Sequence, residues 1–238
     1  STRKESSAAS DVYKRQISNC SFSSVCAAIR IGLKSIGSIS DVHISHCSMK
    51  NVWREGIKIE CSEGGNISDI NIQDITMNDV SRPIFILLNN RFEPDDLGSS
   101  LELDHIPEIG TMSDIIISDI IASDSDEMRN THYRFDDDVM GSPKFAGIRI
   151  DAEKNHPIRN LTLRNISYKF IGGVKLSDIP NEYPEVIDKL IDCDTLSSEN
   201  YYPDWSRASF MDIRNIIGLN VRNIQCLSLI HISEPTRH

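Results

Sequence analysis

The sequence predicts an all-β fold in which short strands stack as the successive rungs of a solenoid. The first observation is a repeated unit, because Ile39–Met49 and Ile67–Met77 carry the same pattern of Ile, Ser, Asp and alternating apolar residues 28 positions apart. The second is another strand-like segment in each period, Ala27–Gly32 before the first copy and Glu55–Cys61 between the two. A fixed period of about 20 to 50 residues is typical of repeat architectures, so two strands per period indicate stacked rungs.

The repeat extends well beyond two copies. Further copies lie at Ile17–Cys20, Met112–Ile120, Ile158–Ile166 and Leu219–Ile224. The steps between equivalent positions are 27, 28, 45, 46 and 58 residues, counted over Cys20, Cys47, Ile75, Ile120, Ile166 and Ile224. The short steps predict rungs without inserted loops. The long steps predict inserted loops, and insertions in a solenoid often lie on its binding face.

Within each unit the apolar residues alternate with polar ones, as in Val42-His43-Ile44 and Ile70-Asn71-Ile72. This period of two buries one face of a strand and leaves the other in water. Stacked copies would therefore build aliphatic columns, in which each fully buried Ile or Leu contributes about 1.5–3 kcal/mol. One rung cannot bury its apolar face alone, so the stack is the stable unit.

A polar residue follows each strand at the same place in the repeat. Its identity is always Asn, Asp or His: Asn19, His46, Asp74, Asp119, Asn165 and Asn223. These residue types tolerate a left-handed backbone and form hydrogen bonds within their own turn. We interpret the position as the structural corner of each rung rather than as a catalytic site.

Length, charge and hydropathy narrow the function classes. At 238 residues the chain can form one large all-β domain, and it contains no apolar run near the 18 or so residues of a membrane-spanning helix and no signal-peptide pattern. A net charge of −10 argues against nucleic acid or an anionic membrane as a partner. With this net charge, an acidic polysaccharide could be held only by a local basic patch. We also expect the chain to be a monomer.

The six cysteines show neither a Cys-x-x-Cys pair nor a Cys/His metal spacing, so we expect no metal and no cofactor. Cys20 and Cys47 occupy equivalent repeat positions on strands about 4.8 Å apart, which makes a disulfide geometrically possible. We favour two small buried thiols stacked in the core.

Both ends of the chain lack the repeat. Residues 1–16 and 228–238 resemble translated sequencing-adapter tails, and we predict that they are non-native, which leaves 17–227 as the solenoid domain. On this interpretation the chain starts within a repeat, and we expect the upstream rungs and any signal peptide to be missing.

The candidate site lies on the second strand of the rungs. Alternation places the aliphatic neighbours inward and leaves Arg30, Lys58 and Phe85 side by side on the outer face, where Arg149 joins them from a later strand. Two cations beside an exposed aromatic ring can hold a carboxylated sugar. A solvated sheet face without a ligand explains the same pattern.

Asp136-Asp137-Asp138 could form an acid/base couple or a cation site, but three consecutive acids in a loop are more often simply solvated.

The segments Cys26–Gly32, Gly56–Glu60 and Gly64–Ile70 resemble a known enzyme family. The sequence is similar to glycoside hydrolase family 28, the polygalacturonase and rhamnogalacturonan hydrolase group, and more closely to its divergent bacterial branch. The later segments Asn155–Leu163 and Glu182–Glu185 also look like that branch. The likeness spans about Ile17 to Cys226.

This resemblance implies a right-handed parallel β-helix of the pectin lyase-like type, secreted or periplasmic, that hydrolyses a pectic polysaccharide or oligosaccharide with inversion. In such a reaction one carboxyl group protonates the leaving oxygen while another activates water. Cys26-Ala27-Ala28 occupies the family's Gly-His-Gly position, so the catalytic aspartates are expected upstream of Ile17. The resemblance therefore implies that this fragment is inactive by itself.

The chain departs from the family at two substrate-binding positions. The family's Arg-Ile-Lys segment reads Lys58-Ile59-Glu60, so Lys58 keeps a charge without the guanidinium fork and Glu60 reverses the sign. Ala27 also replaces the family histidine. We expect a neutral or mixed pectic substrate, such as a rhamnose-containing chain, unless Arg30 compensates for Glu60.

Two other classes fit a stack of this kind. One is a non-catalytic carbohydrate-binding, tailspike or adhesin module, because a fold does not fix a function. The other is a polysaccharide lyase, which relies on calcium and on an Arg or Lys base. Arg30 or Lys58 could serve as that base, although neither sits among the acidic calcium ligands that such a site needs.

Overall fold

The computed structural model describes residues 14–33, 35–92, 105–124, 147–170 and 210–228. Every regular element in these ranges is a strand, which confirms the all-β prediction. No helix in the described part could span a membrane. The strands are β1 (Arg15–Ser18), β2 (Ser21–Ser24), β3 (Ile29–Leu33), β4 (Ser38–Ile39), β5 (Val42–Cys61), β6 (Asn66–Ile67), β7 (Ile70–Leu88), β8 (Thr111–Ser123), β9 (Ile148–Ala152), β10 (Ile158–Phe170), β11 (Met211–Ile213) and β12 (Ile216–Ser228).

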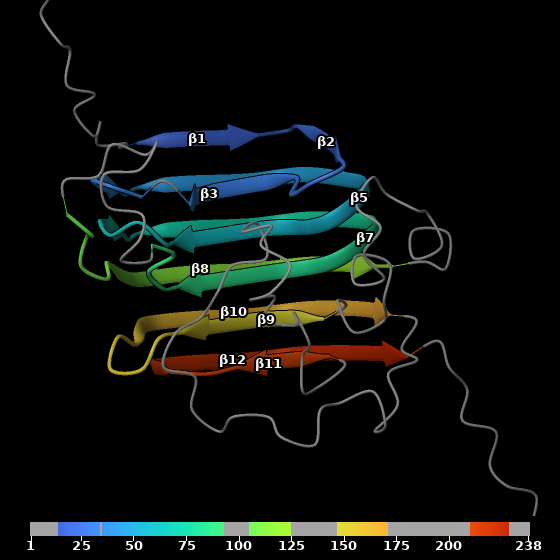
Figure 1. The fold of residues 1–238 in the computed structure, drawn as a ribbon. Coiled ribbons are helices and arrows are strands. Elements are labelled where there is room, and N and C mark those ends of the chain that lie inside the picture. Colours follow the sequence, from blue (N-terminus) through green and yellow to red (C-terminus); the bar gives the residue numbers. More distant parts are fainter. Residues whose placement is uncertain (1–13, 34, 93–104, 125–146, 171–209, 229–238) are drawn as a thin grey trace, which may run out of the picture.

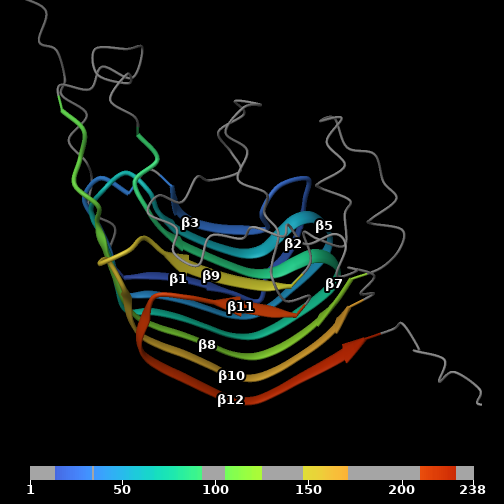
Figure 2. The ribbon, with the colours of Figure 1, turned by 60° about the horizontal axis from the view of Figure 1, so that its bottom comes forward.

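The strands pair in parallel and lie one above another from β1 to β12 (Figure 1). One row runs β1, β5, β7, β8, β10 and β12, and we call it the first wall. A second row joins β3 to the C-terminal part of β5, then the C-terminal part of β7, β9 and β11, and we call it the second wall. The long strands β5 and β7 belong to both walls, which Figure 2 shows as two curved layers.

The core lies between the walls as columns of aliphatic side chains in strict register. One column is formed, in stacking order, by Ile17, Ile44, Ile72, Ile117, Leu163 and Val221. Its four central members are at most 1% exposed. The 27- and 28-residue steps of the sequence therefore correspond to the pairing of one strand with the next, as the repeat predicted, and the alternating pattern correctly predicted which side chains are buried.

The predicted corner residues have the expected backbone. All six have positive φ angles, between 51° and 58°: Asn19, His46, Asp74, Asp119, Asn165 and Asn223. Their side chains also connect rungs, because Asn223 Nδ2 donates to Asn165 Oδ1 at 3.0 Å and Asn165 Nδ2 donates to Asp119 Oδ1 at 2.8 Å. Further positive-φ residues at Asn51 and Asp79 lie within β5 and β7.

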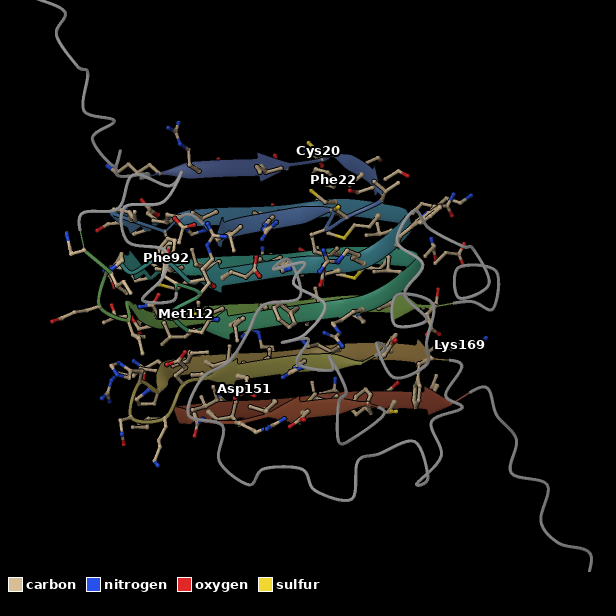
Figure 3. The ribbon with its side chains drawn as sticks, viewed as in Figure 1. Cys20, Phe22, Phe92, Met112, Asp151 and Lys169 are labelled. Carbon is tan, nitrogen blue, oxygen red and sulfur yellow. The ribbon has the colours of Figure 1, made fainter. Side chains whose placement is uncertain are left out.

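The cysteine prediction is half correct. Cys20 and Cys47 are both free thiols at equivalent positions, and Cys47 is buried while Cys20 is exposed. The reason is their place among the strands, since Cys20 lies at the outermost described level (Figure 3). Cys47 lies one level further in, because the Ser48 amide donates to the Cys20 carbonyl oxygen. Each thiol donates to the carbonyl oxygen two residues earlier, of Ser18 or Ser45.

The described strands reach slightly into the predicted tails. Arg15 and Gln16 pair with Val42 and His43, and Ser228 pairs with Phe170, so strand pairing in the described part extends one or two residues beyond the range 17–227. Most of the predicted loops, with Asp136–Asp138, Cys193 and Glu182–Glu185, lie outside the described residues.

Candidate functional site

The outward side chains of the second wall form two rows that cross the strands. In the first row Arg30, Lys58, Phe85 and Arg149 are successive register partners, followed by Asp212 on β11. In the second row Glu60 pairs with Leu87, Leu87 with Asp151, and Arg214 continues β11 two residues after Asp212. Adjacent strands lie about 4.8 Å apart, so the structure brings all five predicted site residues onto one surface. We call this surface the charged face: Arg30, Lys58, Glu60, Phe85, Arg149, Asp151, Asp212 and Arg214.

The charged face is far more buried than the alternating pattern predicted. Phe85 is 2% exposed and Lys58 is 1% exposed, so the expected exposed aromatic ring is a wrong prediction. Part of the reason is cation packing, because Lys58 Nζ lies 5.1 Å and the Arg82 guanidinium carbon 5.5 Å from the centre of the Phe85 ring, and both cations are themselves buried. Arg30 differs from these residues, because its side chain is 34% exposed to solvent.

Glu60 is the centre of the charged contacts on β3 and β5. Arg30 Nε and one terminal nitrogen lie 2.8 and 2.7 Å from the same Oε2 of Glu60, and Lys58 Nζ lies 3.1 Å from Oε1. The Glu60 carboxylate is completely buried. Charge-assisted bonds of this kind fix the donor geometry, so Glu60 holds Arg30 in one orientation at the rim of the face.

A second carboxylate, Asp151, lies on β9 (Figure 3). Its Oδ2 lies 3.5 Å from Arg214 Nε and 3.9 Å from Arg149, while its Oδ1 accepts the Ala152 amide at 2.9 Å. Burial raises the pKa of Asp151 above its usual value, and the two guanidinium groups offset only part of that rise. Arg214 also forms a two-point contact with Asp212, at 3.1 and 2.9 Å.

Some residues of this network were missed at the sequence level. Glu55 is fully buried and lies 3.7 Å from Lys58 Nζ and 3.6 Å from Arg54 Nε, and Glu55 pairs in register with Arg82. Asp151, Asp212 and Arg214 were also missed as site residues. A signal existed, because Lys58 and Glu60, Arg149 and Asp151, and Asp212 and Arg214 are all opposite charges two positions apart, which places each pair on one strand face.

The charged face is close to electrically neutral. It contains four cations and three anions, a net charge of +1, within a chain of net charge −10.

No family model, curated protein or solved structure matches the chain. Among the described residues no three His, Cys, Asp or Glu side chains are grouped so that they could hold a metal ion. The arrangement therefore offers one accessible guanidinium supported by buried ion pairs.

Proposed function

We propose that the charged face binds a pectic glycan and that the chain is part of a pectin-active glycoside hydrolase of family 28, built as a right-handed parallel β-helix. The observation that carries the proposal is the register of Arg30, Lys58, Phe85 and Arg149 on one outward row. Strictly parallel pairing with a 27- to 28-residue step also supports the β-helix.

Arg30 is the residue of the charged face that contacts a bound glycan. Its guanidinium is partly exposed and is oriented by Glu60, whereas Lys58, Phe85 and Arg149 follow it along the same outward row and are buried. Preorganised donors bind polar ligands at a lower entropic cost than flexible ones. Glu60, which also contacts Lys58, therefore positions Arg30, and Arg30 donates to a sugar hydroxyl or carboxylate.

The near neutrality of the face favours a neutral or mixed substrate. Arg30 already pairs with Glu60, and Arg149 faces Asp151. The face therefore has little net positive charge with which to bind a polysaccharide that carries a carboxylate on every sugar. We therefore propose a rhamnose-containing pectic chain rather than plain polygalacturonate, met in an extracellular or periplasmic setting. From the 238-residue chain alone we expect binding without hydrolysis.

The proposal is tested by isothermal titration with rhamnogalacturonan and polygalacturonate oligosaccharides of equal length. Arg30→Ala should weaken binding about tenfold, the loss expected when a charge-assisted hydrogen bond is removed. Arg164→Ala is the matched control, because Arg164 is an exposed arginine on the first wall, and it should bind as the wild type does. Equal losses in both variants, or no binding by the wild type, would refute the site. A strong preference for polygalacturonate would refute the substrate assignment, and release of new reducing ends would refute the expected inactivity.

A further inference from the structure

A groove of about 420 Å³ lies on the outer surface of the first wall. It crosses β7, β8, β10 and β12, which lie side by side in the sheet (Figure 2). The charged face belongs to the second wall, so the groove is a separate surface of the molecule.

Two rows of side chains line this groove. One is a corner row and the other is an outward row in strict register: Asp74, Asp119, Asn165 and Asn223 in the first, and Thr76, Ile121, Ser167 and Gln225 in the second. Each strand therefore contributes one corner residue and one outward residue, and the pair recurs about every 4.8 Å along the stack. A surface that repeats in this way suits a ligand that is itself a repeating chain.

The corner row offers both donors and acceptors of hydrogen bonds. Asn223 donates to Asn165 at 3.0 Å, and Asn165 donates to Asp119 at 2.8 Å. An amide nitrogen has two N–H groups, and within the described part this ladder uses one of them on each asparagine. The hydrogen bond from Asn165 lowers the pKa of Asp119, so its carboxylate remains an acceptor in mildly acidic solution. Neighbouring hydroxyl groups of a sugar, which both donate and accept, match this set.

The outward row has an apolar centre between polar neighbours. Ile121 on β8 is 64% exposed, and its register partners are Thr76 and Ser167. An aliphatic side chain exposed to this extent gains free energy when an apolar surface covers it. The C–H face of a sugar ring, edged by hydroxyl groups, supplies an apolar surface for Ile121 and polar partners for the hydroxyls beside it.

The charge of the groove sets it apart from the charged face. No lysine or arginine is among the described residues that line it, whereas Asp74 and Asp119 are carboxylates on adjacent strands. An acidic sugar would bring its own carboxylate towards them, and like charges oppose such a contact. We propose that the groove binds a straight chain of uncharged sugars, with one sugar over each strand. This second glycan site goes beyond the function proposed for the charged face and does not depend on it.

The inference is tested by nuclear magnetic resonance titration of the 238-residue chain with cellotetraose, an uncharged and extended tetrasaccharide. Maltotetraose, whose linkages curve the chain, and tetragalacturonate, which is acidic, should each bind about fivefold more weakly or worse. Arg30→Ala should bind cellotetraose as the wild type does, which separates the groove from the charged face. Ile121→Ala should weaken binding about fivefold, because it removes most of the apolar contact. Ser167→Ala should weaken it about threefold through the loss of one uncharged hydrogen bond.

Ile116→Ala is the matched control, because Ile116 is an exposed isoleucine on the same strand that does not line the groove. It should bind cellotetraose as the wild type does, and unchanged circular dichroism will show that each variant folds. Absence of cellotetraose binding by the wild type would overturn the inference. So would an equal loss in Ile116→Ala or Arg30→Ala, unchanged binding by Ile121→Ala, or binding of maltotetraose or tetragalacturonate as tight as that of cellotetraose.

Discussion

Ile117 provides the sharpest test of the aliphatic columns. It is fully buried between Ile72 and Leu163 in register, and its sequence neighbour Ile116 is the same residue type facing outward at 38% exposure. Ile117→Ala removes three carbon groups worth about 0.8 kcal/mol each, or about 2.4 kcal/mol. Because the rungs above and below are held by their own pairing, the cavity collapses only in part, which raises the expected cost to about 3–4 kcal/mol.

The assay is urea unfolding followed by far-ultraviolet circular dichroism, with Ile116→Ala as the matched control. That control should cost about 1 kcal/mol or less, because an outward position loses little buried area. The free energy of unfolding of a domain is about 5–15 kcal/mol, so a loss of 3–4 remains measurable. If Ile116→Ala costs as much as Ile117→Ala, the period-two interpretation of the first wall is refuted.

Three further predictions concern single side chains. Asn165→Ala should cost about 1–3 kcal/mol in thermal unfolding, because it strains a backbone with φ of 53° and removes ladder bonds, and Asn165→Gly should lose less since glycine adopts this backbone freely. Cys61 should resist iodoacetamide at mildly alkaline pH while exposed Cys20 reacts, because burial raises the Cys61 pKa to about 11; mass mapping of early Cys61 labelling would contradict this. The raised pKa of Asp151 means that its contribution to stability is fully present below pH 3.8 and is lost as the pH rises through the folded-state pKa. The wild type should therefore lose stability relative to Asp151→Asn over that rise, and a difference independent of pH would show that Asp151 does not titrate in this way.

Much of the scaffold could be predicted because it depends on local pattern. The alternation around Ile44 and Ile72 determines which side chains face inward, and the fixed step determines which of them meet. The corner residues could be predicted for the same reason, since Asn165 and its equivalents need a left-handed backbone whatever surrounds them. The continuity of β5 could not, because Asn51 turns the chain without ending the strand.

The candidate site was harder to predict because its burial and its ion pairs depend on side-chain contacts between neighbouring strands. Alternation correctly places Lys58 and Phe85 on one outward row, but it equates outward with exposed. Lys58 and Arg82 lie over the ring of Phe85, and these contacts follow from side-chain packing rather than from any local pattern. The coupling of Arg30 to Glu60 crosses 30 residues and becomes visible only when the rungs are stacked.

Each rung of this stack contacts chiefly the rungs next to it, and that has a consequence for motion. In a row of paired parallel strands the cost of opening a strand depends on how many neighbouring strands cover it. The backbone amides of β7 and β8, covered on both sides, should exchange with solvent most slowly, and those of β1 and β12 most quickly. Fraying would then advance inward from the ends, and Arg30, close to one end, would lose its fixed orientation before the centre of the stack opens.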